Sequence, residues 1–164
     1  PTEFIFCPYL LKEFRNRWFL FGSKASNLVL YNLALDRILS VEPAKDVAFR
    51  ENPDFDPDTF FEDVIGVSKN IGNTPRKIKF LATAEQSKYI MTKPLHHSQK
   101  LIHRFEDGSC EFMIQVVINY EMYSVFMSYG RGIKILSPRN AVKYMKDKLR
   151  QAAEQYNEDD IEEK

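Results

Sequence analysis

An alternation of strand-like and helix-like segments that begins at Arg76 constrains the fold of this chain most strongly. The first segment, KIKFLA, has the composition of a strand. Thr83, with Gln86 three residues later, forms a capping box and predicts a helix over residues 84–92. This helix is expected to stop before Pro94, because the residue before a proline is biased away from helical backbone. The region therefore begins as one strand and one helix.

A β-hairpin and a second helix are predicted next. KLIHRF and CEFMIQVVI flank Asp107-Gly108, a dipeptide typical of hairpin turns. Asn119 is expected to cap the following helix and Gly130 to end it. The apolar stripe of that helix has the spacing i, i+3, i+4, i+7 and consists of Met122, Val125, Phe126 and Tyr129.

A fourth strand, GIKIL, and a final helix complete the order βαββαβ plus one helix. This order is that of a ferredoxin-like domain, which we expect over residues 76–156. Ser137 with Pro138 is the expected start of the final helix. One face of that helix is apolar and could close the domain or meet a partner subunit; it consists of Val142, Met145, Leu149, Ala152 and Tyr156.

The residues before this domain predict a small β structure and a linker. EFIF, YLLKEF, WFLFG, NLVLYNL and RILSV are short strand-like segments, typical of a small barrel or a highly twisted sheet over residues 1–45. Residues 46–75 are expected to form a surface linker with one short helix, since Asp56 followed by Pro57 is a good helix start. The helix should run to about Gly66 and pack through Phe60, Phe61, Val64 and Ile65. The fold class expected for the whole chain is α+β.

The composition limits the possible functions but does not identify one. The 164 residues contain 23 Lys or Arg and 23 Asp or Glu, so any site for an anion must be local. Cys7 and Cys110 show no CxxC spacing, which favours reduced thiols in a cytoplasmic protein, although one disulfide stays possible. No apolar run reaches the roughly 20 residues that span a bilayer, and no signal peptide opens the chain, so no membrane partner is expected. The acidic tail, residues 157–164, is expected to be solvated, and a start at Pro1 suggests a piece of a longer chain.

Arg15 and Arg17 flank Asn16, a residue that tolerates the positive φ of a tight turn. Guanidinium groups donate paired hydrogen bonds to phosphate or carboxylate and keep their charge when partly desolvated. Aromatic residues of the same strand set would supply stacking surfaces for a nucleotide or a single-stranded nucleic acid; they are Tyr9, Trp18, Phe19 and Tyr31.

Plainer interpretations stand beside this one. Trp18 is more often a core residue, and arginines at a turn often only solubilise the chain. Asp36 and Arg37 could pair locally at the end of a strand. A metal site is not expected, because His96, His97, His103 and Cys110 lack ligand spacing. A hydrolase built on Ser98 and His97 lacks a nucleophile elbow and an orienting acid.

The motifs CPYLL, RWFLFG, LALDRILSV and FDPDTFFEDVIGV, in that order, resemble the WYL-domain transcriptional regulators of bacteria, with Trp18-Phe19-Leu20 at the signature tripeptide. HHSQKL, EDGSCEF and SYGRGIKILSP resemble the C-terminal extension that follows the WYL domain. The resemblance implies a ligand-sensing Sm-like or SH3-like barrel, a ferredoxin-like extension, and DNA contact only through an N-terminal helix-turn-helix, which is not visible in these residues. It also implies that single-stranded nucleic acid or a nucleotide is bound by residues matching Arg15, Arg17 and Arg37, with Tyr9 and Phe19 supporting or stacking.

Three departures from the family pattern concern the barrel. Phe19 replaces the signature tyrosine and removes a hydroxyl, and Ala34 stands where many relatives carry a basic residue. The chain also starts after the family's first WYL strand, so the barrel is expected to be incomplete or completed by another chain. The leading expectation is a non-enzymatic sensor without a cofactor, which forms a homodimer; the rival is a structural dimerisation module with no ligand.

Overall fold

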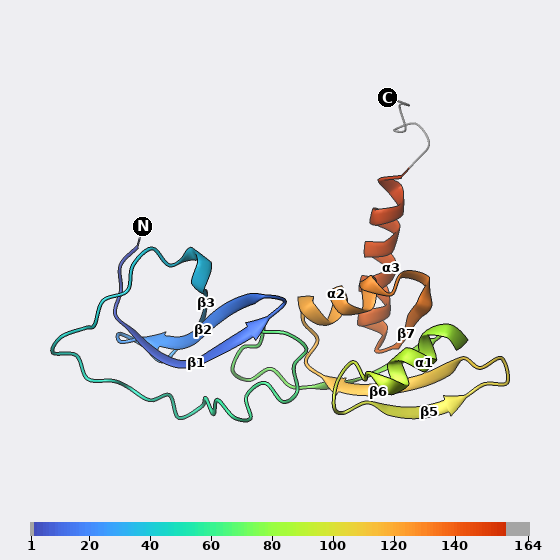
Figure 1. Ribbon diagram of the computed structural model, residues 1–164, viewed down its shortest axis with the longest axis horizontal. Coiled ribbons are helices and arrows are strands. Elements are labelled where there is room, and N and C mark those ends of the chain that lie inside the picture. The colour runs from blue at the N-terminus through green and yellow to red at the C-terminus, as the bar shows by residue number, and fades with distance from the viewer. Residues whose placement is uncertain (1, 157–164) are drawn as a thin grey trace. The chain divides into compact units, whose positions relative to one another are not determined.

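The computed structural model describes residues 2–156, and these form two compact units that divide between Asn73 and Thr74. We call residues 2–73 the N-terminal unit and residues 74–156 the C-terminal unit, and describe each by itself (Figure 1). The expected α+β class is confirmed, since one sheet has three strands and the other has four strands with three helices. The predicted acidic tail lies outside the described residues.

The N-terminal unit is built on an antiparallel sheet with the strand order β1-β2-β3. The strands are β1 (Phe6–Phe14), β2 (Arg17–Lys24) and β3 (Leu30–Ala34), followed by the short 3₁₀ helix η1 (Leu35–Arg37). A closed barrel is not formed by the described residues, because β1 and β3 are both edges of this sheet. The expected strand RILSV is absent as well. Its Leu39 and Val41 are 82% and 81% exposed, so no neighbour buries them as a barrel strand would require.

The predicted linker contributes much of the core of the N-terminal unit. Phe21 of β2 is buried with Phe55, Phe60 and Val67, which all come from the irregular segment after η1. The rings of Phe21 and Phe61 lie 4.7 Å apart, and those of Phe55 and Phe60 lie 4.8 Å apart. These residues bury apolar area that the three strands cannot bury by themselves.

The helix expected from Asp56 to Gly66 is not formed, although its first turn is started as predicted. The Asp56 carboxylate accepts hydrogen bonds from the backbone N–H of Asp58 at 3.0 Å and from the hydroxyl of Thr59 at 2.8 Å. Beyond this point the chain makes separate turns. Phe60 and Phe61 both pack into the aromatic cluster, and the packing of two successive rings prevails over the weak helix preference of aromatic residues. The expected burial of Phe60, Val64 and Ile65 is confirmed.

The C-terminal unit has the predicted order βαββαβ followed by a helix. Its elements are β4 (Arg76–Ala82), α1 (Ala84–Thr92), β5 (Lys100–Arg104), β6 (Cys110–Val116), α2 (Tyr120–Ser128), the 3₁₀ helix η2 (Gly130–Gly132), β7 (Ile133–Ser137) and α3 (Arg139–Glu154). The strands lie in the order β5-β6-β4-β7, and every neighbouring pair is antiparallel. This is the ferredoxin-like arrangement that the sequence predicts.

Two of the three helix caps predicted for the C-terminal unit are confirmed. The side chain of Thr83 accepts from the backbone N–H of Gln86 at 3.4 Å, and that of Asn119 accepts from Met122 at 2.7 Å. Ser137 is not the cap of α3, because it is the last residue of β7 and pairs with Lys79 of β4. Pro138 takes the cap position and supplies no side-chain hydrogen bond.

The core of the C-terminal unit lies between one face of its sheet and the helices (Figure 1). Phe80 of β4 contacts Phe112 of β6 and Phe126 of α2, with ring centroids 5.5 and 5.2 Å apart. Alternate residues of β4 and β6 are therefore buried, while the residues between them face the other side of the sheet.

Candidate anion-binding site

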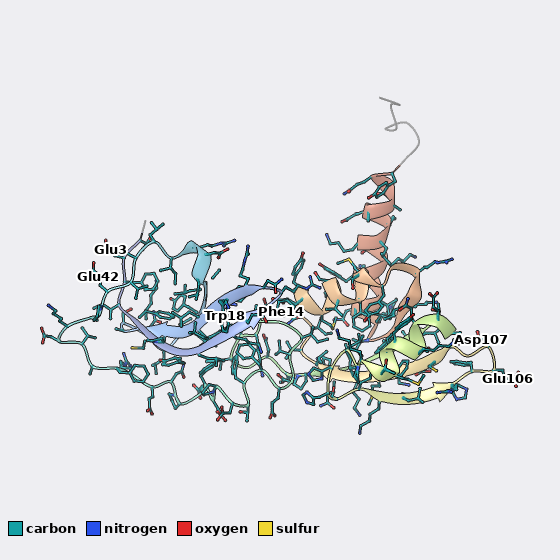
Figure 2. The ribbon with its side chains drawn as sticks, in the orientation of Figure 1. Glu3, Phe14, Trp18, Glu42, Glu106 and Asp107 are labelled. Atoms are coloured by element: carbon teal, nitrogen blue, oxygen red, sulfur yellow. The ribbon has the colours of Figure 1, made fainter. Side chains whose placement is uncertain are left out.

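The tip of the β1–β2 hairpin carries the first candidate arginine. Arg15 and Asn16 form a two-residue turn in which φ is 53° and 61°, the positive pair that matches the twist of a hairpin. The guanidinium carbon of Arg15 lies 5.4 Å from the ring centroid of Phe14, the residue before it. Figure 2 shows Phe14 near this tip. A positive charge over an aromatic face is thus displayed at the end of the sheet.

Arg17 and Arg37 come from two elements that contact each other. Arg17 opens β2, and its Nε lies 3.2 Å from Oδ2 of Asp36 in η1. Both side chains of this ion pair are 51% exposed. Arg37 follows Asp36 directly and is also exposed. The local pairing of Asp36 with Arg37 that the sequence left open is therefore replaced by a pairing of Asp36 with Arg17.

Tyr9 and Phe19 belong to the packed side of the N-terminal sheet. The Tyr9 hydroxyl donates to the carbonyl oxygen of Arg50 at 2.9 Å and shares a hydrogen bond with the hydroxyl of Ser23 at 2.5 Å. The Tyr9 ring lies 5.7 Å from that of Phe55, and Phe19 packs against the same cluster. Both rings therefore pack against the core of the unit and support the sheet, whereas the three arginines lie at the surface.

Trp18 is not a core residue, so the core interpretation is wrong. It is 51% exposed, because Phe19 and Phe21 occupy the packed side of β2 and Trp18, the residue before Phe19, faces the other side of the strand. Trp18, labelled in Figure 2, instead helps to line a shallow groove. The other lining residues include Leu11, Lys12, Glu13, Pro57, Phe61 and Glu62. Strand parity read from the sequence could have indicated this exposure.

The groove beside Trp18 does not suit an anion. Glu13, Asp58 and Glu62 contribute three carboxylates to its lining, and Lys12 is the one cation among the residues that line it. The ammonium of Lys12 lies 5.1 Å from the ring centroid of Phe61, so the cation is held against an aromatic face. The arginines of the hairpin tip and of η1 are therefore the better candidates for an anion site.

Two carboxyl groups have perturbed ionisation, and both lie in turns outside this site. The hydroxyl of Thr59, followed by the backbone N–H of Asp58, lowers the pKa of Asp56. The hydroxyl and backbone N–H of Ser109 lower the pKa of Asp107 in the β5–β6 turn, where Figure 2 labels it. Such hydrogen bonds stabilise turns and do not indicate catalysis.

Residues 2–156 offer little other candidate chemistry. No group of three or more His, Cys, Asp or Glu side chains in this range could hold a metal ion. His96 and His97 are not in a strand but in the loop after α1, with ring centroids 4.1 Å apart. Cys7 and Cys110 are free thiols, and both are buried. No helix in the described range is long and apolar enough to cross a bilayer.

The fold and the candidate site define an α+β protein that joins a small antiparallel unit with surface arginines to a ferredoxin-like domain. Residues 74–153, nearly all of the C-terminal unit, match the family model of the WCX domain. This match confirms the resemblance to the extension of WYL-domain regulators. No curated protein sequence matches the chain significantly.

One solved structure similar to the chain is proteasome accessory factor B/C (PafBC) of Arthrobacter aurescens. The two proteins are 16% identical and superpose with a TM-score of 0.44 over 95% of this chain. The chain spans about a quarter of that protein, since 23% of its length is covered.

Proposed function

We propose that the chain is the ligand-sensing regulatory portion of a bacterial transcriptional regulator, without enzymatic activity. Its C-terminal unit is a WCX domain, and WYL-domain regulators carry such an extension after their sensing domain. In this proposal Arg15, Arg17 and Arg37 bind the phosphates of a single-stranded nucleic acid or a nucleotide. DNA is contacted through a further N-terminal domain, and the protein works in the cytoplasm.

The ion pair between Arg17 and Asp36 is the observation that carries the proposal. Both partners are half exposed, and an exposed pair of this kind contributes only about 0–1 kcal/mol. A phosphate can accept two parallel hydrogen bonds from a guanidinium. Phosphate can therefore displace Asp36 from Arg17 at little cost.

Displacement of Asp36 would connect binding to a change in the chain. Asp36 lies in η1, which packs against β2, and the irregular segment that leads to the C-terminal unit starts directly after η1. A ligand that favours the arrangement with the pair broken would shift the population toward it. Tyr9 and Phe19 support the strands that carry the site, a role consistent with their packing and with the hydrogen bonds of Tyr9.

The test is the binding of short single-stranded oligonucleotides, measured by fluorescence anisotropy over a range of salt concentrations. Arg15→Gln, Arg17→Gln and Arg37→Gln should each weaken binding and reduce the slope of log K against log salt by about 0.7 for each phosphate that is no longer neutralised. Lys45→Gln is the matched control, because it removes one exposed cation of the same unit outside the site. Equal binding by all four variants would refute the assignment of the site.

A structural dimerisation module is the second candidate, and one observation favours it. The first half of α3 is packed through Ala141 and Met145, whereas Leu149 in its second half is 44% exposed and Tyr156, just after the helix, is 81% exposed. Native mass spectrometry distinguishes the candidates. A homodimer that retains no small molecule and binds no oligonucleotide supports the module, and an oligonucleotide-bound protein supports the sensor.

A further inference from the structure

Positive charge is concentrated in the C-terminal unit, although the whole chain is neutral. Residues 74–156 contain 14 Lys or Arg against seven Asp or Glu, a net charge of +7. Residues 2–73 contain eight against 11, a net charge of −3. The C-terminal unit therefore has a local field that total charge conceals.

The open face of the β5-β6-β4-β7 sheet collects four of these cations. We call the side of the sheet opposite Phe80 the open face, because the helices of the unit do not cover it (Figure 1). Lys77 and Lys79 alternate with buried residues in β4, and Lys134 alternates with buried residues in β7. Lys100 of β5 lies on the same face, because Met113 of β6 pairs with Lys79 of β4 on one side and with Lys100 on the other. All four lysines are exposed.

Among the strand residues of the open face, one carboxylate carries negative charge beside the four lysines. Glu111 of β6 lies 3.1 Å from the ammonium of Lys79. No ion pair joins Lys77, Lys100 or Lys134 to an acid within residues 2–156. Three lysines of the sheet thus keep their charge available for an external partner.

We propose that the open face binds the phosphate backbone of double-stranded DNA. Lys77 and Lys79 are two residues apart in one strand and hence about 7 Å apart, and neighbouring strands are about 5 Å apart. Flexible lysine stems on such a grid can reach successive phosphates, and lysine binds phosphate as a point charge without a shaped pocket. Leu81, Met113 and Leu136 lie on the same face and are partly buried or exposed, and long lysine stems can cover apolar surface of this kind.

The composition of the face favours a duplex over the other anionic partners. Binding of single strands relies on aromatic rings that stack with bases, and the strand positions of the open face carry no Phe, Tyr or Trp. An acidic protein surface would be held by shaped, desolvated contacts, which a flat lysine grid does not supply. A duplex instead presents its phosphates on the outside along its whole length.

The test compares two triple variants of the full 164-residue chain. Lys77→Gln, Lys100→Gln and Lys134→Gln together remove the unpaired cations of the open face and leave the pair of Lys79 with Glu111 intact. Lys88→Gln, Lys143→Gln and Lys146→Gln together remove the same charge from exposed positions on α1 and α3. Equal thermal unfolding of both variants and the parent chain shows that all three are folded.

Binding to a 30-base-pair duplex of arbitrary sequence is then measured by anisotropy between low and physiological salt. The open-face variant should lose at least tenfold in affinity at low salt, with a slope of log K against log salt reduced by about 3, one for each lysine that neutralises a phosphate. The helix variant should bind like the parent chain. An equal loss in both variants would show nonspecific attraction and overturn the proposal.

Two competition arms complete the design. An unlabelled single strand that competes better than the duplex, or an acidic peptide such as polyglutamate that competes as well as the duplex, would also overturn the proposal. The inference stands apart from the arginine site of the N-terminal unit. Arginine variants of that site should weaken single-strand binding. They should not alter the loss of duplex binding that the open-face variant causes. Failure of one proposal can therefore be distinguished from failure of the other.

Discussion

The Nε atom of Arg17 lies 3.2 Å from Oδ2 of Asp36, and this contact connects β2 to η1. If Arg17 binds phosphate, Asp36 competes with the ligand for the same guanidinium. Asp36→Asn removes the competing charge and keeps the shape of the side chain. We expect a severalfold higher affinity for single-stranded oligonucleotides, measured by anisotropy, with stability changed by no more than about 1 kcal/mol. A lower affinity would show that the pair organises the site and does not compete with the ligand.

The β1–β2 turn predicts a sharp difference between two substitutions of Asn16. Its φ of 61° suits Asn and Gly, whereas a β-branched residue in this conformation costs about 1–2 kcal/mol. Asn16→Val should therefore lower the free energy of unfolding of the N-terminal unit by about that amount. Asn16→Gly should be close to neutral, because glycine adopts positive φ without steric cost. Chemical denaturation followed by Trp18 fluorescence measures both, and equal effects would contradict the turn geometry.

Gly22 lies where the β1–β2 ladder leaves no room for a side chain. A Cβ at this position would overlap the carbonyl oxygen of Cys7 and would lie 2.6 Å from the ring of Phe6. Gly22→Ala is expected to cost about 1–3 kcal/mol by forcing the strands apart. Amide hydrogen exchange should show faster exchange in β1 and β2. Amides of the C-terminal sheet provide the internal control, and unchanged protection in β1 would be incompatible with this close approach.

Ser109 should control the ionisation of Asp107. Its hydroxyl donates to the Asp107 carboxylate at 2.6 Å and its backbone N–H donates at 2.9 Å, and together they lower the pKa of Asp107 below its usual value of 3.8. Ser109→Ala should raise this pKa toward 3.8 in a carboxyl titration followed by NMR. Asp56, whose pKa is lowered by other groups, should titrate as before. A pKa of Asp107 that does not move would assign the effect to the backbone N–H alone.

The same shift has a defined effect on stability. A carboxyl whose pKa is lowered by folding contributes stability above its usual pKa of 3.8 and loses it as the pH falls through the lower folded value. The stability difference between the parent chain and Ser109→Ala should therefore be present at neutral pH and shrink in acid below about pH 4.

The C-terminal unit could be predicted from the sequence almost element by element, because its signals are local. Caps at Thr83 and Asn119 and the turn at Asp107-Gly108 each depend on the nearest few residues, and all three form as expected. The start of α3 was misplaced by one residue because Ser137 has a tertiary role in the sheet ladder. Pairing with a distant strand is not encoded in the local pattern.

The N-terminal unit was harder to predict because its core depends on contacts between distant residues. The segment around Phe55 and Phe60 has the composition of a linker, and only the sheet that it covers explains why these rings are buried. The arginines of the candidate site could be named from the RNRW stretch. The partner of Arg17 could not, since Asp36 reaches it only after η1 has folded against β2.

The edge strand β5 of the C-terminal sheet has a consequence for behaviour at high concentration. All five residues of β5 are exposed, and such an unpaired rim can recruit the same strand of another molecule and start aggregation. The register of β5 shifts between Leu101 and His103, which interrupts the regular row of hydrogen-bonding groups. Lys100 and Arg104 place like charges at both ends of the strand. Irregular pairing and electrostatic repulsion together oppose the growth of a sheet across molecules.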